Sequence, residues 1–163
     1  EQPIIERTIL MNLRHAETDD ARLLYDWAND PEVRSMAFAS DPIEWDVHKS
    51  WFEKSLRNPN TQIYVAVQDS KLVGQIRFAV VNDSTAEVDV HTKAGLRGNG
   101  LGTQIILLGV THFFTKSSVQ TIHAIIKPEN AKSRRAFEKV GFKEVQKKLV
   151  NGQECFHMVK ERA

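Results

Sequence analysis

The chain has 163 residues, of which 41% are hydrophobic and 26% are charged, and its formal net charge is +1. These values are typical of a single soluble globular domain with a substantial core. So small a net charge provides no field that would attract nucleic acid or an anionic membrane, and no apolar run has the length of a membrane span. We therefore expect neither of these partners.

Cys155 is the only cysteine, which excludes an internal disulfide and favours a reducing compartment, so we expect a cytoplasmic protein. Residues 1–10 lack the basic-then-apolar order of a secretion signal. We expect them to be an N-terminal extension or expression remnant before Met11, followed by one domain over residues 11–163. The six histidines are scattered without metal-ligand spacing, so we expect no metal site.

The first elements in chain order are a short strand and two helices. A strand over residues 12–15 precedes a helix over residues 19–29, for which Thr18 is the expected cap and Asp30-Pro31 the expected end. A second helix is expected to begin at residues 41–44, with Asp41 as its cap and Pro42 in its first turn. Its apolar residues then follow helical spacing.

The pattern changes to period two after residues 58–60, which predicts strands. A turn at Asp69-Ser70 separates the first strand from a second over residues 72–80. Residues 82–84 make another turn before a third strand over residues 86–91. We therefore expect three consecutive antiparallel strands.

The rest of the chain alternates helices and strands. Residues 101–114 are apolar on most sides and predict a buried helix, followed by a strand over residues 121–126. A helix over residues 129–140 is expected to end at Gly141, and Asn151-Gly152 is typical of a hairpin turn between two last strands. The order β-α-α-β-β-β-α-β-α-β-β predicts a mixed α/β fold around one central sheet.

The most informative motif is Arg97-Gly98-Asn99-Gly100-Leu101-Gly102, which lies between the third of these strands and the apolar helix. Glycines let the backbone approach a ligand closely, the helix start offers N–H groups and a positive dipole end, and Arg97 adds a cation. A P-loop is excluded because Thr103-Gln104 follows the last glycine. A dinucleotide fingerprint is excluded because Thr103 stands where its third glycine would be and no Asp or Glu lies between Gly102 and Glu129. The motif predicts a pyrophosphate cradle, with an ordinary glycine-rich loop as the alternative.

A second motif lies about thirty residues further on, with the sequence Asn130-Ala131-Lys132-Ser133-Arg134-Arg135-Ala136-Phe137-Glu138-Lys139-Val140-Gly141-Phe142. Together the two motifs, in this order, resemble those of the GNAT superfamily of acetyl-CoA-dependent N-acetyltransferases. The resemblance covers nearly the whole chain.

The resemblance implies a mostly antiparallel sheet, splayed between its fourth and fifth strands, with helices on both faces. The resemblance also implies acetyl-CoA as co-substrate and no metal. Family members are often dimers, so a homodimer is possible. The residues expected to bind the cofactor are Val90, His91, Thr92, Arg97, Gly98, Asn99, Gly100, Leu101, Gly102, Thr103, Asn130 and Arg135.

The amino-terminal part is similar to acetyltransferases that modify the amino group of nucleotide-linked 4-amino-4,6-dideoxy sugars. The similarity rests on Trp27-Ala28-Asn29-Asp30-Pro31-Glu32-Val33-Arg34 and on the aromatic residues that follow. The similarity implies a small-molecule amine as acceptor, with a nucleotide-linked amino sugar favoured. Part of the same sequence pattern also occurs in enzymes that acetylate the N termini of ribosomal proteins. The expected substrate-binding residues are Trp27, Phe38, His48 and Trp51, although core packing is an alternative for Trp27 and Trp51.

Acetyl transfer to an amine needs a proton acceptor, and Glu87, Asp89 and His91 alternate on one face of the strand beside the cofactor. We favour Glu87, then Asp89, then His91. Many relatives place a tyrosine where this chain has Phe137, so Ser133 is the expected proton donor to the leaving thiolate, or it binds a helical carbonyl instead. The missing phenol also admits a non-catalytic module that only binds CoA.

Overall fold

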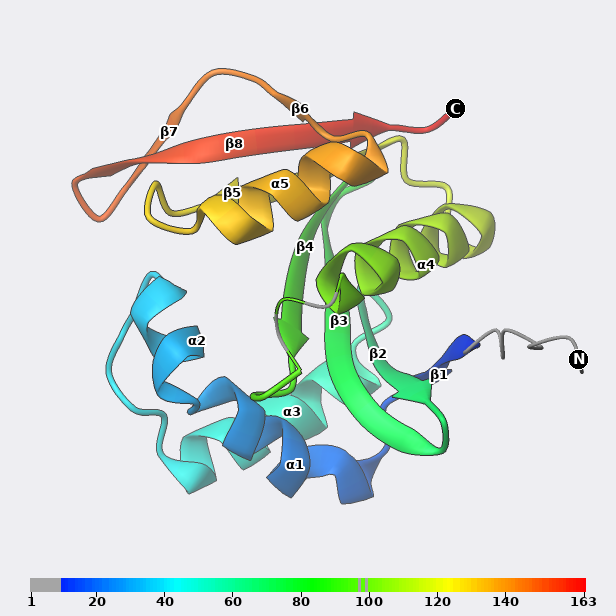
Figure 1. Ribbon diagram of the computed structural model, residues 1–163. Helices are drawn as coiled ribbons and strands as arrows, with labels where there is room; N and C mark the ends of the chain where they lie inside the picture. Colours follow the sequence, from blue (N-terminus) through cyan, green and yellow to red (C-terminus); the bar gives the residue numbers. More distant parts are fainter. Residues whose placement is uncertain (1–9, 97, 99) are drawn as a thin grey trace, which may run out of the picture.

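A mostly antiparallel sheet of eight strands runs through the molecule, seen here in a computed structural model that describes residues 10–96, 98 and 100–163 (Figure 1). The strand order is β1-β2-β3-β4-β5-β8-β6, and β7 pairs with β8. Only β4 and β5 pair in parallel. The strands are β1 (Met11–His15), β2 (Thr61–Gln68), β3 (Lys71–Asn82), β4 (Thr85–Thr92), β5 (Thr121–Ile126), β6 (Lys143–Glu144), β7 (Lys148–Val150) and β8 (Gln153–Glu161).

Helices cover both faces of this sheet, as expected, and each face has its own apolar core. Strand β2 shows the division, because Tyr64 and Ala66 belong to one core and Ile63 and Val65 to the other. The first core lies under α4 and α5, and the second under α1 and α3. The helices are α1 (Ala21–Ala28), α2 (Pro31–Met36), α3 (Trp45–Arg57), α4 (Leu101–Lys116) and α5 (Ala131–Val140). The prediction of a mixed α/β fold around one sheet is confirmed.

The start of the first helix differs from the prediction. Residues Thr18–Asp20 form a turn of 3-10 helix, and α1 begins only at Ala21. The Asp20 carboxylate accepts hydrogen bonds from Arg14, at 2.8 Å, and from the backbone N–H of Glu17, at 2.7 Å. The cap predicted at Thr18 is therefore wrong, because Glu17 and Asp20 cap this turn reciprocally.

The first helix ends before Asp30-Pro31 as predicted, at Ala28, and this pair also begins a further helix. Asp30 accepts a hydrogen bond from the N–H of Glu32 at 2.9 Å, and Pro31 occupies the first turn of α2, a helix that sequence reasoning missed. The same dipeptide suits a helix end and a helix start, because proline cannot continue a preceding helix but fits a first turn.

The next helix, α3, begins at Trp45, so the start predicted at residues 41–44 and the cap at Asp41 are wrong. The side-chain amide of Asn29 pairs with the backbone of Ile43 in both directions, at 2.7 and 3.0 Å. This pairing binds both backbone polar groups of Ile43 outside a helix, and Glu44 takes the N-cap position. Residues 37–44 thus connect α2 to α3 without helical structure.

The carboxyl-terminal half agrees with the prediction more closely. Strand β5 has the predicted bounds, and α5 ends before Gly141, which has a φ of 104°. Asn151 and Gly152 both have positive φ values and make the hairpin between β7 and β8. The two-residue strand β6 was not predicted.

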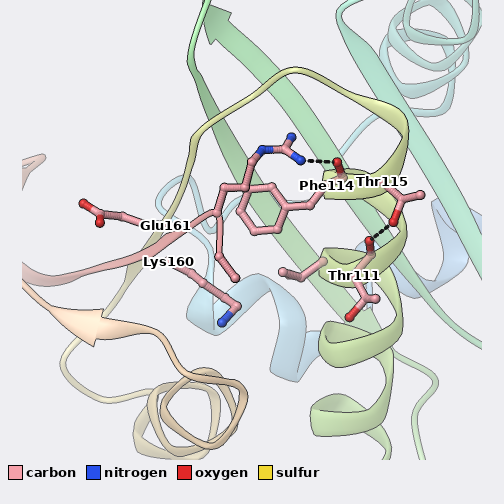
Figure 2. Close-up of a pocket in the computed structure, with 8 residues that line it drawn as sticks. Thr111, Phe114, Thr115, Lys160 and Glu161 are labelled. Carbon is pink, nitrogen blue, oxygen red and sulfur yellow. Dashed lines mark hydrogen bonds between the residues drawn. The ribbon is translucent and has the colours of Figure 1, made fainter.

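The carboxyl terminus is fastened to the end of α4 by Arg162. Its guanidinium donates to the carbonyl oxygens of Phe114 and Ser117, at 2.6 and 2.7 Å, and a small pocket of about 300 Å³ lies beside these bonds (Figure 2). A cation is favourable here, because the last carbonyl groups of a helix lack backbone partners and carry its negative dipole end.

The splay between β4 and β5 is present as expected. The two strands pair only over residues 85–87 of β4 and 121–123 of β5, whereas β4 pairs with β3 along its whole length. In Figure 1, β4 stands at the centre of the molecule and the layer of β5 and β8 turns away from it. The sheet therefore opens beside β4.

The stacked pair of Phe78 and Phe113, 4.3 Å between ring centroids, joins α4 to the sheet, and both rings are fully buried. We expect Phe113→Ala to lower the free energy of unfolding by about 3–5 kcal/mol, because the cavity it leaves lies between rigid elements. Urea unfolding measures this change. Leu107→Ala, at an exposed position of the same helix, is the control, and equal stability of the two variants would contradict this packing.

Candidate active site

A cleft of about 1030 Å³ passes through the opening in the sheet. One end is lined by the start of α4 and by α5, and the other by α2, by residues 37–39 and by α3. Strand β4 lines the middle. Two reactants that enter from opposite ends would therefore meet beside β4.

The predicted cofactor residues gather in this cleft. Those that line it are Val90, His91, Thr92, Gly98, Gly100, Leu101, Gly102, Thr103, Asn130 and Arg135. Arg97 and Asn99 lie outside the described residues.

Gly98 and Gly100 leave open space before the start of α4. Gly98 and Gly100 have φ values of 90° and 74°, and no described atom lies within 4 Å of the position that a Cβ would take at either. Gly100 is the N-cap of α4, and no side chain caps this helix among the described residues. The N–H groups of its first turn are therefore available to an anion, and Lys132, Arg135 and Lys139 line the same cleft.

The opened edge of β4 is suited to an extended ligand. The pairing of β4 with β5 ends at Glu87 and His123. Backbone N–H and C=O groups at the open edge of a strand can pair with an amide-bearing chain, as in the addition of a further strand. This arrangement fits the pantetheine arm of coenzyme A, whose amides can continue the ladder.

The start of α5 brings Asn130 and Ser133 to the same cleft. The side-chain oxygen of Asn130 accepts a hydrogen bond from the N–H of Ser133 at 3.3 Å, so Asn130 is the N-cap of this helix. Phe137 is 2% exposed and packs against Phe142. Of these three cleft residues, Ser133 is the one whose hydroxyl can donate a proton.

Asp89 is held by a guanidinium and an imidazole. One carboxylate oxygen lies 3.3 Å from the guanidinium of Arg77 and 3.3 Å from Nε2 of His91. Burial favours the neutral acid, but His91, Arg77 and Arg34 together hold the pKa of Asp89 well below its usual range. A carboxylate so strongly stabilised as an anion is a poor proton acceptor.

Glu87 has a different environment on the same face of β4. It lines the cleft, and no cation among the described residues forms an ion pair with it. Its register partner across the parallel pairing is His123 of β5, which also lines the cleft. Of the two carboxylates, Glu87 is the one whose oxygens are available to a reactant.

Three of the four predicted substrate residues line the acceptor end. Phe38 and Trp51 are 38% and 39% exposed, and His48 lies deeper, with Nε2 at 3.2 Å from the carbonyl oxygen of Ala21. Trp27 is 6% exposed and belongs to the core under α1 and α3. The structure thus places Trp27 in the core and not on the cleft.

Sequence reasoning missed the two arginines of the acceptor end. The Arg77 guanidinium lies 4.9 Å from the ring centroid of Trp51 while it pairs with Asp89, so it links β3, β4 and α3. The alternation of β3 and its pairing with β4 could have placed it there. Arg34 ends the segment of residues 27–34 that carries the resemblance, but no role was predicted for it because α2 was not predicted.

Arg34 organises the backbone around this end of the cleft. Its guanidinium donates to the carbonyl oxygens of Ala28, at 2.7 Å, and Ala39, at 3.0 Å. Burial lowers the pKa of Arg34, and the charge of Asp89 opposes this effect. The guanidinium therefore fixes the connection after α2 and also contributes positive charge near Asp89.

Two hydrogen bonds tie the acceptor end to the carboxyl-terminal half. Lys127 donates to the carbonyl oxygen of Ser35 at 3.3 Å, and Asn151 donates to that of Phe38 at 3.2 Å. The second bond joins the tip of the β7–β8 hairpin to the segment that lines the cleft. We call these two bonds the acceptor latch.

Neither a cluster of metal-ligating side chains nor a membrane-spanning helix is present in the described part of the chain. No three side chains of the metal-ligating types come together there. None of the helices over the same residues combines the length and apolar character needed to cross a bilayer.

Known structures with the same fold include acetyltransferases that hold coenzyme A. Aminoglycoside acetyltransferase AAC(6')-Ib in complex with coenzyme A has a TM-score of 0.82 at 21% identity, with 94% of this chain and 95% of that chain covered. Spermidine N-acetyltransferase from Vibrio cholerae in complex with CoA and spermine has a TM-score of 0.83 at 22% identity, over 93% and 95% of the chains.

Sequence comparison identifies the family. Acetyltransferase PseH of Campylobacter jejuni is 21% identical over 134 residues, which are 82% of this chain and 83% of that protein. The sequence model described as "Acetyltransferase (GNAT) domain" matches residues 11–143. These findings replace the alternative of a module that only binds CoA. The chain belongs to the GNAT family of acetyltransferases and is an N-acetyltransferase that takes acetyl-CoA as its co-substrate.

Proposed function

We propose that this enzyme acetylates a primary amine of a nucleotide-linked amino sugar, by direct attack within a ternary complex. The observation that carries the proposal is the charge balance of the acceptor end, combined with its aromatic wall. Along the middle of the cleft and its α2 end, the acidic lining residues are Glu32, Glu87 and Asp89, and the basic lining residues are Arg34, Arg77 and Lys127. Acidic and basic side chains are thus equal in number.

This balance argues against polycationic acceptors. Spermidine and aminoglycosides, the acceptors named for two of the similar proteins, carry several amines and are favoured by a net negative pocket. Here Arg77 and His91 already bind Asp89, and Arg34 lies close enough to stabilise the same charge. A substrate with phosphate groups avoids the repulsion that a polycation would meet at these arginines.

The aromatic residues supply the second requirement of a sugar nucleotide. Phe38 and Trp51 expose more than a third of their surface and line the same end of the cleft. Aromatic faces of this kind stack on bases and on the apolar faces of sugar rings. Because Arg77 packs on Trp51, a cation also lies beside the stacking surface.

The described residues divide the chemistry of transfer among them. Acetyl-CoA supplies the acetyl group as a thioester. Glu87 takes a proton from the acceptor amine, whose nitrogen then forms a bond to the acetyl carbon as the bond from carbon to sulfur breaks. Backbone N–H groups of residues 90–92 stabilise the negative charge on the acetyl oxygen, and Ser133 donates a proton to the departing sulfur and regains one from water.

Orientation accounts for a large part of the rate in this proposal. The cleft holds both reactants beside one rigid strand, and orientation of two bound reactants can exceed the effect of one base. The arrangement agrees with direct attack and needs no acetylated side chain. Cys155, the only thiol, is fully buried and donates to the carbonyl oxygen of Gln153.

The acceptor class can be tested with a panel of amines. The purified protein is incubated with acetyl-CoA and, separately, nucleotide-linked amino sugars, free amino sugars, spermidine, an aminoglycoside and peptides with free N termini. Thiol release measures the rate. We expect the nucleotide-linked amino sugars to have the highest kcat/KM, because charge balance and stacking surfaces favour them. Release with peptides alone, or with the polycations alone, would contradict the proposal.

The role of Glu87 can be tested by Glu87→Gln, which keeps the shape of the side chain and removes its basicity. We expect kcat to fall on the order of 10²-fold, while the Kd of CoA stays unchanged because Glu87 is remote from the glycine loop. Glu154→Gln, at an exposed position of β8, is the matched control. Equal kcat values for the two variants would show that Glu87 is not the proton acceptor.

The ion pairs of Asp89 predict a pH dependence of stability. The pKa of Asp89 is lower in the folded protein than in the unfolded chain, where it is about 3.9. The carboxylate therefore stabilises the fold fully above the unfolded pKa, and this stabilisation is lost as the pH falls through the folded pKa. We expect Asp89→Asn to cost about 1 kcal/mol at pH 7, since solvent reaches part of the carboxylate. Urea unfolding of both proteins should show this difference shrinking in acid, and a difference that grew would refute the assignment.

A further inference from the structure

Two histidines beside Glu87 have no role in the mechanism above. His123 of β5 is the register partner of Glu87, and its Nδ1 lies 2.5 Å from Nε2 of His157 on β8. The two rings are tilted by 31°, with centroids 4.8 Å apart. Glu87, His123 and His157 thus form a row across three neighbouring strands, which we call the carboxylate-histidine row.

The row leads away from the cleft. Glu87 and His123 line the cleft, whereas His157 does not and lies on the next strand of the sheet. His157 is only partly buried, so solvent reaches this end of the row. A proton that enters at Glu87 could therefore leave the site without passing the bound reactants.

The relay proposed below requires one tautomer of each ring. Nε2 of His157 faces Nδ1 of His123, and a hydrogen bond with the backbone of Gln146 raises the pKa of His157. A neutral His157 with its proton on Nδ1 can only accept at Nε2, so His123 must donate from Nδ1. This leaves the lone pair of His123 on Nε2, where it can accept a proton.

The charges around the pair keep it neutral near pH 7. Burial lowers the pKa of His123 and the pKa of His157, and neighbouring Lys148 on β7 acts in the same direction. Glu87 on β4 raises both pKa values and so stabilises a single added proton. A second proton would set two N–H groups against each other across the shared bond. The pair is thus built to hold one extra proton.

We propose that the His123–His157 pair relays the amine proton from Glu87 to solvent. Nε2 of His123 takes the proton from Glu87, Nδ1 of His123 passes its own proton to Nε2 of His157, and His157 releases one from Nδ1. One proton enters and one leaves, and Glu87 returns to its anionic form. Both rings are then protonated on Nε2, and they recover their Nδ1 tautomers by proton exchange with water before the next turnover. The relay rests on the proposed function, in which Glu87 is the first proton acceptor.

The first test needs no acceptor. Nitrogen-15 spectra of the imidazole rings are recorded across about pH 5 to 8, with His123→Gln and His157→Gln used to assign the two rings. We expect both histidines to carry their proton on Nδ1 at neutral pH, and the pair to take up one proton in a single step. A proton on Nε2 of His123, or two independent titrations, would overturn the relay.

The second test uses the amine that the wild-type enzyme accepts best. We expect His123→Gln to lower kcat on the order of 10²-fold and to change its pH profile, with the KM of the acceptor and the Kd of CoA unchanged. His157→Gln should show a weaker loss with the same change of profile. Imidazole added to His123→Ala should restore activity, which a merely structural role would not permit.

The control for both tests is His112→Gln. His112 lies on α4 against Tyr64, 5.1 Å between ring centroids, and does not line the cleft. It should keep the wild-type rate and pH profile. Wild-type kinetics in His123→Gln would overturn the relay while the proposed function stands. Absence of thiol release from the wild type with every amine would defeat the proposed function instead, and the spectra would then decide the relay alone.

Discussion

The one-sided pairing of β4 is the constraint on which the site depends. This strand pairs with β3 along its whole length and with β5 only as far as Glu87. Full pairing on both sides would close the sheet and leave no cleft, whereas loss of the β3 partner would leave the strand unsupported. The opening costs little, because the bound cofactor can satisfy the backbone groups that β5 leaves unpaired. One edge of β4 is therefore held rigidly by β3, and the other edge is left open by β5 beyond Glu87.

The same strand also separates two carboxylates that look equivalent in the sequence. Glu87 and Asp89 are two residues apart and face the same side, yet only Asp89 lies opposite Arg77 in the β3 register. Asp89 becomes part of the framework that carries Trp51 and the acceptor end. Glu87 lies where β5 leaves, beside His123, and stays available for proton transfer. The position of each carboxylate relative to the point where β5 separates from β4 thus gives Glu87 and Asp89 different environments.

The cofactor half of the site could be predicted from the sequence, whereas much of the acceptor half could not. The glycine loop, the apolar helix and the Asn130 motif are local patterns, which can be interpreted from residues that are neighbours in the sequence. The acceptor half depends on contacts between distant residues, such as the Asn29 amide that holds Ile43 and the Arg34 side chain that binds Ala39. The His123–His157 pair is 34 residues apart and meets only through the β5–β8 register, so in the sequence it is two scattered histidines.

The acceptor latch has a consequence for how specificity can change. Residues near positions 35–38 and 127–151 jointly shape the entrance, although they are 92 and 113 residues apart in the chain. A hairpin tip tolerates substitution and insertion far better than a strand that carries catalytic groups. We therefore expect substitutions at the hairpin tip to change which amines are accepted. The residues proposed to carry out acetyl transfer would remain unchanged.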